Sequence, residues 1–269
     1  DNTSSSHYQV CIGYNSGGTG GDYNTIVGSN SGRNNSTGDS NTFIGVDSGA
    51  FNTSGSSNVL IGNTSGFSQT SASYNVIIGD DAGRDNTDSK VVFIGYKAGY
   101  NNEGTGTFNT MIGYKAGTEF TRSAGDGGSS PAGGSNTFMG YEVALKCTTG
   151  GFNTYIGAQS GGCVGTSTGG WNAIVGEKAG YNITSGSSQA FFGRGSGYSN
   201  TSGYRNTLIG NRAGYSNKLG NYNVLVGGIS GYYLGKDQSS STTCSGNVYI
   251  GDESGVNTKS TIDNCFVGY

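Results

Sequence analysis

One short pattern recurs along the whole chain: two apolar residues followed by glycine, as in Asn206-Thr207-Leu208-Ile209-Gly210. The glycine falls at 15 positions in 269 residues, and eight of the 14 intervals between them are 17 residues. The other intervals are 15, 16, 18, 19, 24 and 27 residues. A fixed period with a few insertions is the signature of a repeat array. We call these residues the anchor glycines and number other positions by their offset from them: Gly13, Gly28, Gly45, Gly62, Gly79, Gly95, Gly113, Gly140, Gly157, Gly176, Gly193, Gly210, Gly227, Gly251 and Gly268.

The residues before each anchor glycine have the composition of a short β-strand. Position −3 is small or β-branched, position −2 is large and apolar, and position −1 is nearly always Ile or Val, as in Val59-Leu60-Ile61. With 53 Gly and only 32% hydrophobic residues, the chain must bury a thin core repeatedly instead of one thick core. A 17-residue repeat is too short for a strand and a helix. We therefore predict an all-β parallel β-solenoid of about 15 coils, forming a single domain over residues 1–269 with long loop insertions near 118–135 and 232–246.

After each anchor glycine come two variable residues, then Ser or Ala, then a second glycine. Ala82-Gly83 and Ser196-Gly197 are examples. Two glycines four residues apart predict a tight corner in which one backbone segment approaches another. We expect a second short extended stretch after this corner, followed by a variable loop.

Asparagine occupies position −4 in almost every repeat. Stacked coils would place these residues above one another at a turn, so we predict a ladder of side-chain amides in which each Asn bonds to the next. The predicted ladder comprises Asn24, Asn41, Asn58, Asn75, Asn109, Asn136, Asn153, Asn172, Asn206, Asn223, Asn247 and Asn264.

Both faces of the predicted strand are apolar. Side chains alternate along a strand, so positions −1 and −3 point to one side and position −2 to the other. One side fills the coil. The other side is a long apolar ladder that exceeds the patch a monomer tolerates. It is covered either by partner chains, which we favour, or by a second strand of a wider coil.

Seven Asn-x-Ser/Thr sequons are candidate N-glycosylation sites. Five of them fall six or seven residues after an anchor glycine, which predicts an exposed corner there. The seven are Asn2, Asn34, Asn35, Asn52, Asn63, Asn182 and Asn200.

Five cysteines are scattered without a Cys-x-x-Cys pair. Cys147 and Cys163 follow their anchors by seven and six residues in consecutive repeats, so stacking would bring them to disulfide distance. Cys244 and Cys265 form a second candidate pair, which leaves Cys11 over. The alternative is five buried thiols.

Several functional classes find no support in the sequence. A net charge of −3 gives no electrostatic footprint for nucleic acid, and no stretch approaches the 18 apolar residues of a membrane span. The single histidine, His7, has no acid or nucleophile beside it. The acidic pairs Asp80-Asp81 and Asp252-Glu253 are adjacent in sequence instead of facing each other across a cleft. We expect no enzyme activity, no metal site and no cofactor.

The amino-acid pattern of the repeat resembles a known class of repeat array. The segments Asn109-Thr110-Met111-Ile112-Gly113 and Asn206-Thr207-Leu208-Ile209-Gly210, each followed by Ala-Gly, look like the repeat arrays of tail-fibre-like proteins. More distantly, they are similar to the β-roll heads of trimeric autotransporter adhesins. The resemblance implies an extracellular, cell-surface or virion-surface fibre, commonly trimeric.

These observations together predict a structural protein of an extracellular fibre or filament, whose partner is another copy of itself. Neither end of the sequence shows a polar capping repeat, so we expect association through the apolar strand faces or through uncapped coil ends, as a head-to-tail filament, a homotrimer or a segment of a longer fibre. The alternative is an adhesin or receptor-binding segment that contacts glycans through aromatic corners, with Tyr198 and Tyr215 as candidate contacts. Such aromatics could instead brace the corners against each other.

Overall fold

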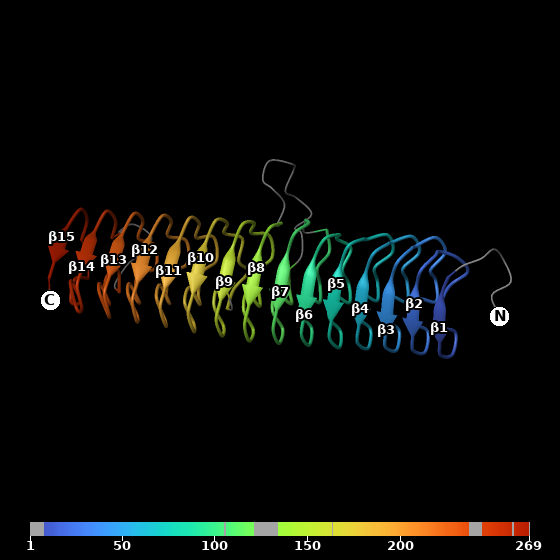
Figure 1. Cartoon of the computed structure of the whole chain (residues 1–269). Coiled ribbons are helices and arrows are strands. Elements are labelled where there is room, and N and C mark those ends of the chain that lie inside the picture. The colour runs from blue at the N-terminus through green and yellow to red at the C-terminus, as the bar shows by residue number, and fades with distance from the viewer. Residues whose placement is uncertain are drawn as a thin grey trace. The chain divides into compact units, whose positions relative to one another are not determined.

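The computed structural model describes residues 8–104, 106–120, 134–162, 164–236, 244–259 and 261–268. Parts of both insertions predicted from the spacing lie outside this range, namely residues 121–133 and 237–243. The chain divides into two compact units, Asp1–Ser135 and Asn136–Tyr269. The first unit contains strands β1–β7 and the second contains β8–β15 (Figure 1).

The fold is an all-β parallel β-solenoid with a repeat of roughly 17 residues, as the anchor spacing predicts. The described residues form 15 strands of three residues each and no helix. In the first unit these are β1 Val10–Ile12, β2 Thr25–Val27, β3 Thr42–Ile44, β4 Val59–Ile61, β5 Val76–Ile78, β6 Val92–Ile94 and β7 Thr110–Ile112. In the second unit they are β8 Thr137–Met139, β9 Thr154–Ile156, β10 Ala173–Val175, β11 Ala190–Phe192, β12 Thr207–Ile209, β13 Val224–Val226, β14 Val248–Ile250 and β15 Cys265–Val267.

Within each unit, consecutive strands pair in parallel and in strict register. Phe43 of β3 lies beside Leu60 of β4, which lies beside Ile77 of β5. The same pairing holds in the second unit, where Phe191 lies beside Leu208 and Leu208 beside Leu225. Each offset from the anchor therefore becomes a column of side chains running from coil to coil.

The turn after each strand requires backbone conformations with positive φ. After β4, φ is 134° at the anchor Gly62, 51° at Thr64 and 57° at Gly66. A Cβ atom on Gly62 would lie 2.3 Å from the carbonyl oxygen of Gly79 in the next coil, so only glycine fits at the anchor. A Cβ atom on Gly66 would lie 3.0 Å from the side chain of Leu60. The second glycine therefore makes room for the large side chain at position −2.

Backbone hydrogen bonds between coils continue through these turns. The Thr64 N–H donates to the carbonyl of Val46 in the preceding coil at 2.9 Å, and the Gly66 N–H donates to Ala82 in the following coil at 3.0 Å. The polar groups of the turn are thus satisfied by neighbouring coils, which explains how so much irregular backbone can stack. The second extended stretch expected after the corner is not a strand; this part of the coil is turn and irregular backbone.

The core of each unit consists of a few columns of buried side chains, each column contributed by one position of the repeat. Position −2 is fully buried in β2–β14, with large side chains such as Phe93 and Tyr155. Position +3 contributes small buried residues, as the Ser-or-Ala pattern suggests, and position +7 contributes buried side chains such as Asn52 and Ile183. This core explains how a chain with few apolar residues still folds.

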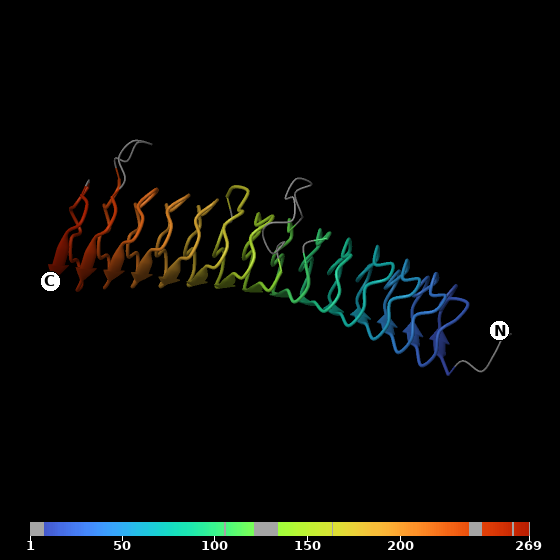
Figure 2. The same ribbon diagram turned by 90° about the horizontal axis from the view of Figure 1, so that it is seen from above.

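The strands lie on one side of the coils and the turns and loops on the other, within each unit (Figure 2). In every one of the strands β2–β14 the middle residue is buried, while the first and third are half-buried or exposed. We call the surface formed by positions −3 and −1 the outer face. No second strand covers it within either unit among the described residues.

Candidate functional site

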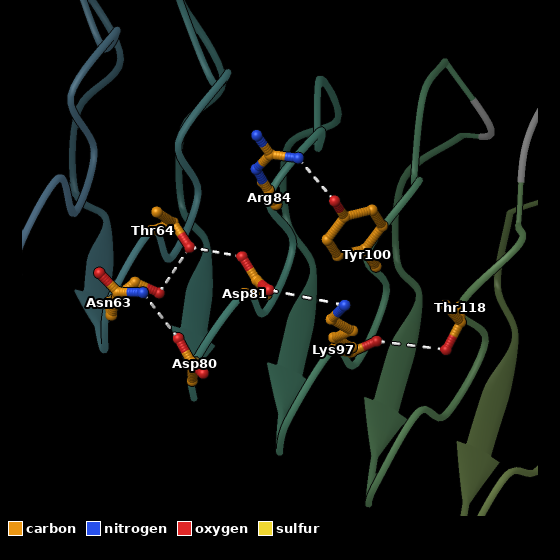
Figure 3. Close-up of polar contacts among 8 residues, drawn as sticks. All are labelled: Asn63, Thr64, Asp80, Asp81, Arg84, Lys97, Tyr100 and Thr118. Carbon is orange, nitrogen blue, oxygen red and sulfur yellow. Dashed lines mark hydrogen bonds and ion pairs between the residues drawn. The ribbon is translucent and has the colours of Figure 1, made fainter.

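The corner after each strand carries polar side chains that connect neighbouring coils. In the first unit, the Asn63 side chain donates to Asp80 at 2.9 Å and the Thr64 hydroxyl donates to Asp81 at 2.6 Å (Figure 3). Asp81 also forms an ion pair with Lys97 at 3.7 Å. The acidic pair Asp80-Asp81 therefore takes part in contacts between coils.

Three further contacts extend this corner. Arg84 donates to the Tyr100 hydroxyl at 2.6 Å, and this hydrogen bond raises the pKa of the guanidinium. The interaction of Lys97 with the Tyr96 hydroxyl raises the pKa of its amine, and the charge of Asp81 adds to the shift. The Thr118 hydroxyl approaches the Lys97 carbonyl at 3.4 Å (Figure 3). The contacts of Arg84 and Lys97 favour the charged forms of these two side chains.

Other sequence candidates for chemistry do not assemble into a site. Asp252 and Glu253 are both exposed. His7 lies outside the described residues. Within the described ranges, no three His, Cys, Asp or Glu side chains lie together as a possible metal site. None of the described segments forms a helix long and apolar enough to cross a membrane.

The Asn column at position −4 forms a ladder within each unit, interrupted in the first unit by Val91, but its bonds differ from the prediction. Eleven of the twelve Asn side chains are buried, and Asn264 is half-buried. The Asn58 side-chain oxygen accepts from the backbone N–H of Asn75 at 3.0 Å, and its amide donates to the Ala72 carbonyl at 2.9 Å. Bonds from one side-chain amide to the next occur in only part of the column, as between Asn247 and Asn223 at 2.9 Å. Each Asn therefore joins the backbones of neighbouring coils.

A second ladder of side-chain amides, not predicted from the sequence, lies at position +7. The Asn52 amide donates to the Asn35 oxygen at 3.2 Å, and the Asn102 amide donates to Asn86 at 2.7 Å. These side chains are at most 1% exposed. The sequence did indicate that position +7 is interior, because other coils have apolar residues there. These are Phe120, Cys147, Ile183 and Leu234.

This ladder corrects three of the predicted glycosylation sites. Asn35, Asn52 and Asn200 are buried, so their amides cannot carry a glycan in this fold. At this corner the side chains of these Asn residues are therefore interior at position +7 and reach the surface at position +6. Asn34 and Asn63 are exposed, Asn182 is half-buried with its amide bonded to Tyr198 at 2.9 Å, and Asn2 lies outside the described residues.

The cysteine pairings predicted from the spacing also change. Cys147 is buried, and its backbone forms a parallel bridge with that of Ser167 in the next coil. Cys163 itself lies outside the described residues. Cys244 is a buried free thiol whose sulfur lies 3.4 Å from the Lys259 carbonyl, and Cys265 is an exposed free thiol, so the second predicted disulfide is not formed. Cys11 is also a free, exposed thiol.

The tyrosines predicted as glycan contacts belong to a stacked column. Tyr181, Tyr198, Tyr215 and Tyr232 follow one another with ring centroids 5.2, 4.8 and 5.0 Å apart and interplanar angles of 9°, 4° and 6°. The faces of Tyr198 and Tyr215 are therefore covered by neighbouring rings, and only their edges remain available. Stacking of rings from consecutive coils against one another accounts for this column.

A hollow of about 160 Å³ lies beside this column in the second unit. It is lined by the corner residues of three consecutive coils: Glu177, Lys178, Arg194, Gly195, Tyr198, Arg212 and Tyr215. We call it the corner notch.

Three comparisons with known proteins return nothing: no family model, no curated protein and no solved structure matches this chain.

Proposed function

We propose that this protein is a non-enzymatic structural component of an extracellular fibre or filament, and that it associates with further copies of itself through its outer face. The observation that carries the proposal is the composition of that face. It takes two residues from each of the 15 strands, and not one of them is charged, although the chain contains 14 Lys or Arg and 17 Asp or Glu. The extracellular placement rests on the resemblance of the repeat to tail-fibre arrays.

The outer face is regular as well as uncharged. Its residues are Thr, Val or Ala at position −3, with Cys265 in β15, and mostly Ile or Val at position −1. Ile44, Met139, Phe192, Ile209 and Ile250 are each between 38% and 42% exposed. A parallel sheet usually has both of its faces covered, and a contiguous apolar strip of this kind marks an interaction surface on a soluble protein.

A second copy of the chain is the partner that best fits this surface. Its columns repeat about every 4.8 Å, the spacing of paired strands, and another copy presents the same columns at the same spacing. Two such faces can interdigitate as dry ladders of β-branched side chains, in the manner of stacked sheets. An isologous contact of this kind needs no second protein.

Placing a charge on the outer face should therefore weaken association. We expect Ile209→Lys, at a residue that is 40% exposed in the middle of the second unit, to cost about 2 kcal/mol of association free energy, which is roughly a 30-fold rise in the dissociation constant. Asn211→Lys adds the same charge two residues away at an exposed corner and should leave association unchanged.

Sedimentation velocity over a range of protein concentrations measures both variants against the natural chain. Circular dichroism first establishes that each variant keeps the strand signal and the thermal midpoint of the natural protein. A natural chain that stays monomeric at every concentration would contradict the proposal, and so would equal association of the two variants.

A second candidate function is carbohydrate binding through aromatic corners. It is favoured by the aromatic residues at position −5, where Tyr74, Phe108 and Trp171 are 64%, 59% and 57% exposed. These residues adopt φ of 63°, 67° and 58°, which directs bulky side chains away from the coil at a backbone cost. Binding of neutral oligosaccharides to the dissociated protein separates this candidate from association alone.

A further inference from the structure

The corner notch exists because one coil lacks a side chain at position +2. The coil before it has Lys178 at this position and the coil after it has Arg212, but the middle coil has Gly195. The backbone is left-handed at all three, with φ of 54°, 57° and 62° at Lys178, Arg212 and Gly195. A Cβ atom on Gly195 would lie 3.5 Å from Arg212 Cγ and 3.7 Å from the Tyr215 ring. A side chain there would therefore fill the hollow.

The notch has a surplus of positive charge. Arg194 is paired with Glu177 at 3.1 Å, with both side chains about half exposed. Neither Lys178 nor Arg212 forms an ion pair with any described residue, so the lining has two uncompensated cations on a protein whose net charge is −3. The corresponding corner of the first unit differs, because Lys97 there is balanced by Asp81.

The remaining wall of the notch is aromatic. Tyr198 and Tyr215 are stacked with centroids 4.8 Å apart, which fixes both rings, and the Arg212 guanidinium lies 6.0 Å from the Tyr215 centroid. The Glu177 pair similarly restrains Arg194. The hollow of about 160 Å³ is close to the volume of cavities that admit a single six-membered ring, about 150 Å³. It is larger than a bare inorganic ion requires.

We propose that the corner notch binds one acidic sugar unit, with the anionic group held by Lys178 and Arg212 and the ring against the tyrosine edges. Arginine offers a planar donor fork that matches carboxylate and sulfate groups, and tyrosine edges combine apolar surface with a hydroxyl. The ligand is a saccharide bearing a carboxylate or a sulfate ester. This site is separate from the outer face, and it can exist whether or not the chain self-associates.

The test is isothermal titration with three probes: a galacturonate trisaccharide, a sulfated disaccharide and neutral maltotriose. We expect saturable binding of at least one acidic probe, weakened by added salt because the contacts are exposed, and no binding of maltotriose. The two acidic probes distinguish a carboxylate from a sulfate ligand. Absence of saturable binding by both acidic probes would overturn the proposal, and equal binding of the neutral probe would do the same.

Two variants locate the site. Gly195→Asn fills the hollow with a residue that the same column already uses at Asn15 and Asn30, and Arg212→Gln removes one cation. Each should raise the dissociation constant about 10-fold or more, which corresponds to about 1.4 kcal/mol. Ile229→Asn, in the same column one coil beyond Arg212, is the matched control and should bind like the natural chain. Binding that both notch variants leave unchanged would place the site elsewhere and refute the proposal; Arg212→Gln keeps the test decisive if Gly195→Asn does not fold.

Discussion

Replacing the anchor Gly62 with alanine should destabilise the first unit by about 3 kcal/mol or more. Its φ of 134° is a conformation that residues with a side chain rarely adopt. The new methyl group would also lie 2.3 Å from the Gly79 carbonyl oxygen, so the next coil must move away. That movement weakens the bond from the Gly79 N–H to the Ile61 carbonyl, which is now 2.8 Å long. Urea denaturation followed by circular dichroism measures the loss.

Gly104→Ala is the control for this substitution. Its φ is also positive, at 60°, but no atom lies within 4 Å of the Cβ position. The control therefore suffers only the backbone cost of a left-handed alanine, about 1–2 kcal/mol. Equal losses in the two variants would show that close stacking of anchor glycines does not determine stability.

Replacing Asn58 with alanine should destabilise the first unit by about 1–3 kcal/mol, because a buried backbone N–H loses its acceptor. The backbone N–H of Asn75 would lose its acceptor, whereas the carbonyl of Ala72 would lose one donor and keep the other, the Gln69 amide at 3.1 Å. Asn58 is fully buried, so water cannot easily replace it. In a quasi-one-dimensional repeat protein such a break separates the coils on its two sides. Hydrogen exchange should therefore show faster exchange in the coils next to Asn58.

Asn63→Ala provides the comparison for the Asn ladder. Asn63 is exposed and its amide donates to Asp80 at 2.9 Å, so the loss should be within about 0.5 kcal/mol, as for most surface substitutions. A similar loss in both variants would mean that the position −4 ladder contributes no more than a surface contact.

The fold could be predicted because one column was nearly invariant. The anchor glycine set the register, and the strand residues before it, such as Val59-Leu60-Ile61, alternate in the way that places Leu60 inside and its neighbours on the outer face. Glycine at the anchor and at position +4 identified the corner, since both positions require positive φ. These are local constraints, and a single sequence with many repeats displays them many times.

The predictions that need correction concern positions at which the residue type differs between repeats, or coils whose length departs from 17 residues. Position +7 alternates between Asn and apolar residues, and the sequons at Asn52 and Asn200 drew attention to the surface although both side chains are interior. The predicted Cys147–Cys163 pair includes a residue outside the described range, and in a coil longer than 17 residues the backbone of Ser167 lies opposite Cys147. The corner notch depends on side chains from three coils around Gly195, and no pattern within one repeat indicates it.

The two methionines of the chain offer the most direct test of the proposed interface. Met111 occupies position −2 and is fully buried, whereas Met139 occupies position −1 on the outer face and is 40% exposed. Oxidation by dilute hydrogen peroxide converts accessible methionine to the sulfoxide, and mass spectrometry of peptides reports each site separately. If copies associate through the outer face, Met139 should oxidise rapidly in dilute protein and several-fold more slowly at concentrations where association is complete, while Met111 stays protected throughout. A Met139 oxidation rate that does not change with protein concentration, in protein that has associated, would contradict association through the outer face.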